Sequence, residues 1–230
     1  MRLDGKGVVV TGGLGTLGAA VAAAAEAAGA TVARLDVAQP KQPGELVFGG
    51  VDLTDEAPTR RVMDEIAARL GRIDGLANIA GGFTWQTVRD GEIAAWRAMF
   101  EINVLTALTA SRAALAHLGK AGPAAIVNVG AGAASRAAAG MGAYAAAKSG
   151  VLRLTESLAE ELTGAGVRVN AVLPTIIDTP ANRRDMPKAD FTTWVTPQDI
   201  AEVVVFLLSE QASAVNGAAV PVGNPRRGRG

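Results

Sequence analysis

Short apolar runs recur along the chain, bounded by glycine, proline or polar residues. Runs of this kind are typical of strands that are buried on both faces of a sheet. The sequence predicts seven such strands, at residues 7–11, 30–36, 46–48, 73–82, 124–130, 167–174 and 217–222. Pro221 lies in the last run, and because proline cannot donate to a strand ladder, this strand is expected at an edge.

Between these runs lie longer stretches in which apolar residues recur every three or four positions, the period of a helix with one buried face. They are residues 19–28, 56–70, 93–118, 140–162 and 197–209. Strands that alternate with helices predict a single Rossmann-type α/β domain over residues 1–230, a doubly wound, mostly parallel sheet of about seven strands with helices on both faces. Residues 175–196 show no clear period, which is typical of a functional loop, here the expected substrate loop.

Composition narrows the classes of function. Lysine plus arginine and aspartate plus glutamate both number 22, and a net charge of zero argues against a nucleic-acid or membrane partner. The chain has no cysteine, which excludes thiol chemistry, and its one histidine, His117, is expected in a packing or surface role. No segment resembles a signal peptide or reaches transmembrane length, so we expect a cytoplasmic protein that acts on a small molecule without a metal.

A glycine-rich loop follows the first predicted strand. Gly13, Gly15 and Gly18 fit the pattern G-x-G-x-x-G between a strand and a helix, the context that a dinucleotide site requires. The glycines permit close approach of the backbone to a pyrophosphate, which then sits at the helix N-terminus. The alternative is a glycine-rich turn with no ligand. The phosphate-binding residues expected here are Gly12, Gly13, Gly15, Thr16, Leu17 and Gly18.

Two acidic residues suit the adenosine half of a dinucleotide. Asp36 ends the second strand, eighteen residues after Gly18, where a carboxylate can bind the ribose hydroxyls and repel a 2′-phosphate. Arg34 lies on the same face and can offer a phosphate contact instead, so NAD(H) is favoured and NADP(H) stays open. Asp52 and Leu53 are expected near the adenine, and the alternative for Asp52 is a cap for the next helix.

Small and polar residues follow the fourth strand, and one asparagine lies inside the next helix. Asn78, Ala80 and Gly81 leave room for a ribose or nicotinamide against the backbone. Asn103 lies among apolar neighbours, and a buried asparagine must find hydrogen-bond partners or lower stability. It either satisfies a local backbone kink or holds a water beside a catalytic lysine.

One helix carries a candidate acid–base pair. Tyr144 is the only tyrosine in the chain, and Lys148 lies four residues later on the same side of the helix. A neighbouring lysine cation should lower the phenol pKa by favouring the phenolate. A tyrosine of this kind can donate a proton to a carbonyl or imine as it is reduced. The alternative is a surface tyrosine and lysine that happen to share a helix face.

In this order and at this spacing, the motifs resemble the short-chain dehydrogenase/reductase family over nearly the whole chain. The resemblance implies a nicotinamide cofactor, with Tyr144 as the acid–base. It also implies that Lys148 lowers the tyrosine pKa and binds the nicotinamide ribose, and that Asn103 anchors a proton-relay water. The residues that carry the resemblance are Thr11-Gly12, Gly18, Asp52, Asn78-x-Ala80-Gly81, Asn103, Tyr144-x-x-x-Lys148 and Pro174.

The most serious departure from the family is a missing serine. The family's catalytic serine usually stands about where this chain has Ala131, and Ser135 comes four residues later, as expected of a loop serine. The missing serine, an aromatic Phe83 after Ala-Gly-Gly, and the stretch from Leu173 to Trp194 resemble dihydropteridine reductase. This resemblance implies a substrate site at Ala131, Tyr144, Phe83 and Trp194.

Three functions remain open. The first is NADH-dependent reduction of a quinonoid dihydropterin or a similar conjugated ring, which needs no serine to polarise a ketone. The second is carbonyl reduction, as in a 3-oxoacyl-carrier-protein reductase, and the third is a catalytically silent cofactor-binding protein. Family members pair through the helices around Asn103 and Tyr144, so the resemblance also implies a homodimer or homotetramer.

Overall fold

The computed structural model describes residues 1–42 and 44–224. They form a seven-stranded sheet in the order β3-β2-β1-β4-β5-β6-β7, and every neighbouring pair is parallel. This confirms the predicted doubly wound sheet, with Pro221 in an edge strand. The strands are β1 (Gly7–Thr11), β2 (Thr31–Leu35), β3 (Val47–Phe48), β4 (Gly75–Asn78), β5 (Ala124–Val129), β6 (Val167–Pro174) and β7 (Ala219–Val222).

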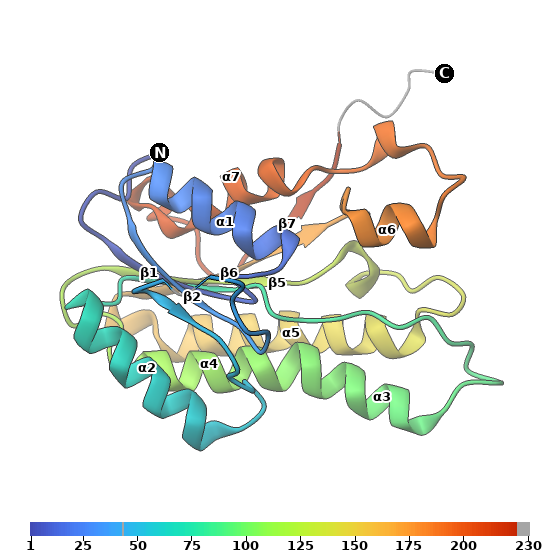
Figure 1. Cartoon of the computed structure of the whole chain (residues 1–230), viewed down its shortest axis with the longest axis horizontal. Coiled ribbons are helices and arrows are strands. Elements are labelled where there is room, and N and C mark those ends of the chain that lie inside the picture. Colours follow the sequence, from blue (N-terminus) through green and yellow to red (C-terminus); the bar gives the residue numbers. More distant parts are fainter. Residues whose placement is uncertain (43, 225–230) are drawn as a thin grey trace.

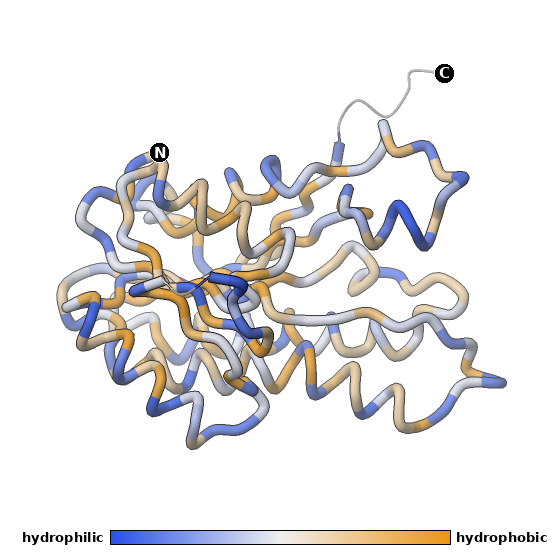
Figure 2. The backbone as a smooth tube through the Cα atoms, in the orientation of Figure 1, coloured by the Kyte–Doolittle hydropathy of each residue, from blue (hydrophilic) through white to orange (hydrophobic). Residues whose placement is uncertain are grey.

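Helices cover both faces of the sheet, which makes three layers. The helices α1 and α7 lie on one face, and α2, α4 and α5 lie on the other (Figure 1). Hydrophobic positions are concentrated along the central strands, whereas α6 is hydrophilic (Figure 2). The helices are α1 (Thr16–Ala27), α2 (Glu56–Leu70), α3 (Ile93–Phe100), α4 (Thr106–Leu115), α5 (Gly142–Glu161), α6 (Pro180–Asp185) and α7 (Pro197–Leu208). Within the described residues, none of them has both the length and the apolarity needed to cross a bilayer.

Local capping explains where two helices begin. The side chain of Asp55 accepts a hydrogen bond from the Ala57 amide and caps α2. Thr196 and Asp199 form a capping box at the start of α7, where Pro197 occupies the first helical position. Because these signals lie in the local sequence, the predicted starts of both helices match the structure.

The predicted helix over residues 93–118 is interrupted. Between α3 and α4, residues Glu101–Leu105 form a π turn, and Asn103 lies inside it. The helix α3 extends past the edge of the sheet and packs along the N-terminal half of α5 (Figure 1). A π turn inside a helix is often found at a functional site, and here it divides the core part of the helix from the part beside Tyr144.

The interpretation of residues 175–196 as one irregular loop is wrong. The stretch contains α6 and a short 3-10 helix, Phe191–Thr193. Thr179 caps α6, and Arg183 pairs with Asp178 through two hydrogen bonds. These short polar contacts replace the apolar period that a longer helix shows, which is why the sequence pattern did not indicate them.

Candidate active site

The candidate residues meet at the carboxyl ends of β1, β4, β5 and β6, where open α/β sheets bind their ligands. The glycine loop follows β1 and lies against the turn after β4. There the hydroxyl of Thr11 accepts hydrogen bonds from the amides of Ile79 and Ala80. Gly12 has a φ of +61°, and a Cβ at this position would lie 2.9 Å from the Ala80 nitrogen. Glycine is therefore required where the two turns meet.

The start of α1 suits a phosphate group. A Cβ on Gly18 would overlap the carbonyl oxygen of Gly12, so the helix can approach the loop only with glycine here. Gly15 is the N-cap and offers no side-chain hydrogen bond to the first turn. The first amides of a helix lack partners within it, so those of Thr16 and Leu17 can bind a pyrophosphate.

Asp36 lies beside this loop, as the sequence predicts. Its two carboxylate oxygens accept hydrogen bonds from the amides of Leu14 and Ala38, each at 2.9 Å. Arg34, the competing phosphate ligand, is instead paired with Glu26 of α1 at 2.9 Å. The carboxylate thus lies beside the glycine loop, while the guanidinium already has a partner.

Asp52 and Leu53 follow β3 and differ in exposure. The Asp52 carboxylate is exposed and accepts hydrogen bonds from the amide and hydroxyl of Thr54, which lower its pKa. Asp52 is not the cap of α2, because Asp55 has that role. The Leu53 side chain is buried in the core against the sheet, so only its backbone is left for an adenine contact.

Gly81, Asn103 and Lys148 lie together. A Cβ on Gly81 would be 2.7 Å from Asn103 Oδ1 and 3.4 Å from Lys148 Nζ. The Asn103 amide group donates to the carbonyls of Met99 and Gly82 and accepts from the Gly82 amide. Asn103 therefore satisfies the backbone around the π turn, the first of its two predicted roles. The water that it was predicted to hold remains a prediction.

Tyr144 and Lys148 face each other one helical turn apart. Lys148 Nζ lies 5.8 Å from the centre of the Tyr144 ring and donates to the carbonyl of Val129 at 2.8 Å. Burial lowers the Lys148 pKa to about 8 and raises the Tyr144 pKa to about 12. The predicted lowering of the tyrosine pKa is therefore wrong, because burial raises it instead.

The predicted substrate residues separate into two groups. Phe83 meets the Tyr144 ring edge-on, with ring centres 5.0 Å apart, and Ala131 lies two residues after the end of β5 with its side chain buried. Trp194 does not join them. Its side chain is 4% exposed and packs against Phe191, and its role as a substrate contact stays a prediction. Ser135 lies on the exposed loop that follows Ala131.

The chain is similar to known oxidoreductases over nearly its whole length. The family model described as enoyl-(acyl carrier protein) reductase matches residues 12–224. A 2-(S)-hydroxypropyl-CoM dehydrogenase of Xanthobacter autotrophicus is 35% identical, with 96% of each chain covered. The 3-oxoacyl-(acyl-carrier-protein) reductase of Thermotoga maritima is 29% identical, covering 96% of this chain and 98% of the relative.

A solved structure agrees with these matches. Carveol dehydrogenase from Mycobacterium avium, in complex with NAD, superposes with a TM-score of 0.84 at 25% identity, covering 96% of this chain and 97% of the other. The chain belongs to the short-chain dehydrogenase/reductase family. As a member of this family it is an NAD(P)-dependent oxidoreductase, which the sequence predicted. The similarity to dihydropteridine reductase remains a prediction.

A buried polar chain supports the site of this short-chain dehydrogenase/reductase, and the sequence reading did not find it. Asn78 of β4 donates to Asn128 of β5 at 2.8 Å and to Ser111 of α4 at 3.0 Å. Asn128 donates in turn to Thr155 of α5 at 2.9 Å. These hydrogen bonds fix α4 and α5 to the sheet next to Lys148. An asparagine inside the apolar run of β5 was the available signal.

The placement of Asp36 predicts cofactor preference. We expect kcat/KM for NADH to exceed that for NADPH by at least about tenfold, since a 2′-phosphate beside the Asp36 carboxylate would be repelled. The Asp36→Asn variant should reduce this ratio. Adding Glu26→Gln to that variant, which frees Arg34 from its ion pair, should reduce the ratio further. Wild-type preference for NADPH would contradict the assignment of Asp36.

Proposed function

We propose that this short-chain dehydrogenase/reductase uses NADH to reduce a conjugated, electron-poor substrate, such as a quinonoid dihydropterin. The observation that carries the proposal is Ala131, a methyl side chain where the family usually has a hydroxyl. A ketone needs a donor to stabilise the negative charge that develops on its oxygen. A quinonoid ring spreads that charge and needs less help, so it suits a site without the serine.

Four residues have distinct parts in the proposed reaction. When bound, NADH supplies a hydride to the substrate carbon. Tyr144 donates its phenolic proton to the substrate nitrogen or oxygen that gains electrons. The Lys148 cation stabilises the resulting tyrosinate, which is costly in this buried position. A water held next to Asn103 returns the proton, and Gly81 keeps that space free of a side chain.

Carbonyl and alcohol substrates are the second candidate. Two relatives favour it, because they are named for dehydrogenation of a hydroxypropyl compound and for reduction of an oxoacyl group. In this case the Tyr144 hydroxyl alone would stabilise the substrate oxygen.

An assay panel separates these functions. Purified protein is mixed with NADH and, in separate reactions, a quinonoid dihydropterin, a 3-oxoacyl thioester and a set of simple ketones. Faster turnover of the dihydropterin supports the proposal, and faster turnover of the ketones or thioester supports the second candidate. NADH binding without turnover of any compound would indicate a catalytically silent cofactor-binding protein.

The Ala131→Ser variant tests the reason for the missing hydroxyl. We expect unchanged or lower turnover of the dihydropterin, because the new hydroxyl stabilises no charge that develops there. Weak ketone activity should rise, since one well-placed donor to an oxyanion contributes about 3 kcal/mol. The affinity for NADH serves as the control for an intact loop. A large gain on the dihydropterin would contradict the proposed role of alanine.

We also propose that the protein is a homodimer or homotetramer. Exposed apolar side chains lie along α3 and the π turn, namely Ile93, Trp96, Phe100 and Ile102. Such a group is larger than isolated surface residues explain. We expect a dimeric or tetrameric mass at micromolar concentration and dissociation in the Phe100→Asp variant. A monomeric mass for the wild-type protein would contradict this prediction.

A further inference from the structure

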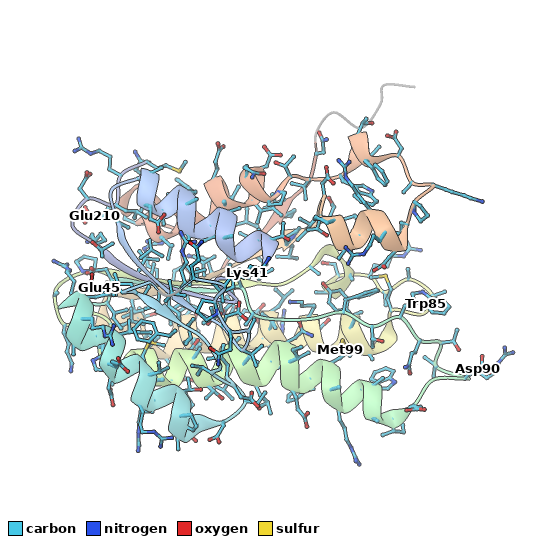
Figure 3. All side chains as sticks on the ribbon, in the orientation of Figure 1. Lys41, Glu45, Trp85, Asp90, Met99 and Glu210 are labelled. Atoms are coloured by element: carbon cyan, nitrogen blue, oxygen red, sulfur yellow. The ribbon has the colours of Figure 1, made fainter. Side chains whose placement is uncertain are left out.

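A short aromatic segment, residues 83–86, is joined to the loop that precedes α5. The amide of Gln86 donates to the Gly140 carbonyl at 2.9 Å, and Nε1 of Trp85 donates to the Ala139 carbonyl at 3.1 Å. Figure 3 shows Trp85 between these two loops, at the end of the molecule where α3 and α5 begin. The indole bond connects residues 54 positions apart in the sequence, so it adds a side-chain attachment to the backbone bond between the two loops.

The backbone at Gly140 is shaped to receive the indole. Gly140 has a φ of +76°, a conformation that favours glycine. A Cβ at this position would overlap Cε2 and Nε1 of Trp85. The indole therefore lies directly on the Gly140 backbone, and any other residue there would displace it.

The same segment reaches the reacting tyrosine. Phe83, two residues before Trp85, meets the Tyr144 ring at an interplanar angle of 86°. Tyr144 itself lies four residues after Gly140, so it directly follows the second of the two joined loops. Phe83 and Trp85 form the feature that we call the aromatic wall.

Burial in the core does not hold the two rings of the aromatic wall in place. Phe83 is 54% exposed and Trp85 is 58% exposed, although both rings are large and apolar. Hydrogen bonds and the contact with Gly140, rather than core packing, hold the indole in place. An exposed aromatic face beside a reacting group is the surface that a flat, apolar substrate group would cover.

We propose that Trp85 is a positioning residue that holds Phe83 against Tyr144, and that the aromatic wall selects substrates with a flat group next to the reacting atom. The second part rests on the proposed function. Ala131, on the β5 side of the site, offers no hydroxyl to orient a substrate, so orientation depends on contact with the wall.

Hydrogen exchange tests the attachment in the protein alone. In Trp85→Phe, which keeps a ring and removes the donor, amides in residues 83–92 and 136–141 should exchange at least about tenfold faster. Gly140→Ala, which displaces the indole, should do the same. Arg89→Ala is the control, because the exposed Arg89 lies in the same segment and pairs with its neighbour Asp90, and it should leave both peptides unchanged. Equal exchange in wild type and Trp85→Phe would overturn the attachment, whatever the protein's activity.

Equilibrium binding tests the selection without any turnover. The probes are 2-naphthol and decahydro-2-naphthol, which share a carbon skeleton but are flat and puckered, respectively. Calorimetry with the NAD-loaded protein should show tighter binding of 2-naphthol. In Trp85→Phe its Kd should rise about three- to tenfold, as expected for loss of an aromatic contact, with no change for the puckered probe. Equal binding of the two probes by the wild-type protein, or an equal loss for both in the variant, would overturn the selection.

Discussion

Replacement of Tyr144 by phenylalanine is expected to lower kcat by about 10²–10⁴-fold, the usual contribution of a general acid. The substitution removes only the hydroxyl. The ring that contacts Phe83 and faces Lys148 is kept, so the aromatic wall and the nicotinamide side of the site should persist. The Kd for NADH should therefore stay within about twofold. Steady-state kinetics and a fluorescence titration with NADH measure the two quantities.

A second hydroxyl on the same helix provides the control. Ser149 follows Lys148, and its hydroxyl donates to the backbone carbonyls of Ala134 and Ala145. Ser149→Ala should change kcat by no more than about threefold, because its hydroxyl has no part in the proposed chemistry. If Tyr144→Phe lost less than about tenfold in kcat, another group would have to be the acid.

Lys148→Met is expected to abolish most activity and yet stabilise the folded protein. Lys148 is buried with one hydrogen bond, and burial lowers its pKa to about 8. Keeping a cation in such a place lowers stability, and methionine fills a similar volume without charge. We expect the free energy of unfolding at pH 7 to rise by about 1–3 kcal/mol, somewhat less than the full pKa shift from 10.5 to about 8 corresponds to, because methionine also loses the hydrogen bond to Val129. Urea unfolding and the kinetic assay measure the two effects.

The pH dependence gives this prediction a definite sign. The lysine pKa is 10.5 in an ordinary environment and about 8 in the folded chain, so between these values the unfolded chain binds more protons. The destabilisation of the wild-type protein by charged Lys148 therefore decreases as the pH rises. The advantage of Lys148→Met should be full below about pH 8 and shrink toward pH 10. An advantage that grows with pH would contradict the burial of a charged lysine.

Thr155→Val is the matched control for the stability measurement. Thr155 lies on the same helix and accepts a hydrogen bond from the buried Asn128 amide. Removing that partner leaves a buried donor unsatisfied, which should lower stability by about 1–3 kcal/mol at every pH. The two substitutions of buried polar groups on α5 are thus expected to act in opposite directions.

Local chemistry decided which parts of the structure the sequence could predict. The predicted starts of α2 and α7 match the structure, and the caps found there, Asp55 and Thr196, act within three residues. The glycine loop followed from the spacing of its residues, because only glycine permits the approach of Gly18 to Gly12. Helical spacing indicated Tyr144 and Lys148, an apolar neighbourhood indicated Asn103, and the family resemblance then gave these residues their expected roles.

The sequence could not predict contacts between residues that are far apart in the chain. The Val195 amide bonds to the Ile176 carbonyl and brings the two ends of residues 176–195 together next to the buried Trp194. The bond from Trp85 to Ala139 also depends on the final arrangement of two loops. The pKa of Tyr144 depends on desolvation, which the sequence does not measure, whereas its spacing to Lys148 is visible in the sequence.

The π turn at residues Glu101–Leu105 bears on which changes of chain length this protein can accept. A π turn holds one residue more than an α turn, so a one-residue deletion here could be absorbed by closing it into regular α-helix. The same deletion within α5 would rotate all that follows by about 100°, since a helix has about 3.6 residues per turn. A deletion in the π turn would nevertheless move the Asn103 amide away from Gly82. We therefore expect folding to tolerate a one-residue deletion at this point, whereas the position of the Asn103 amide depends on the extra residue.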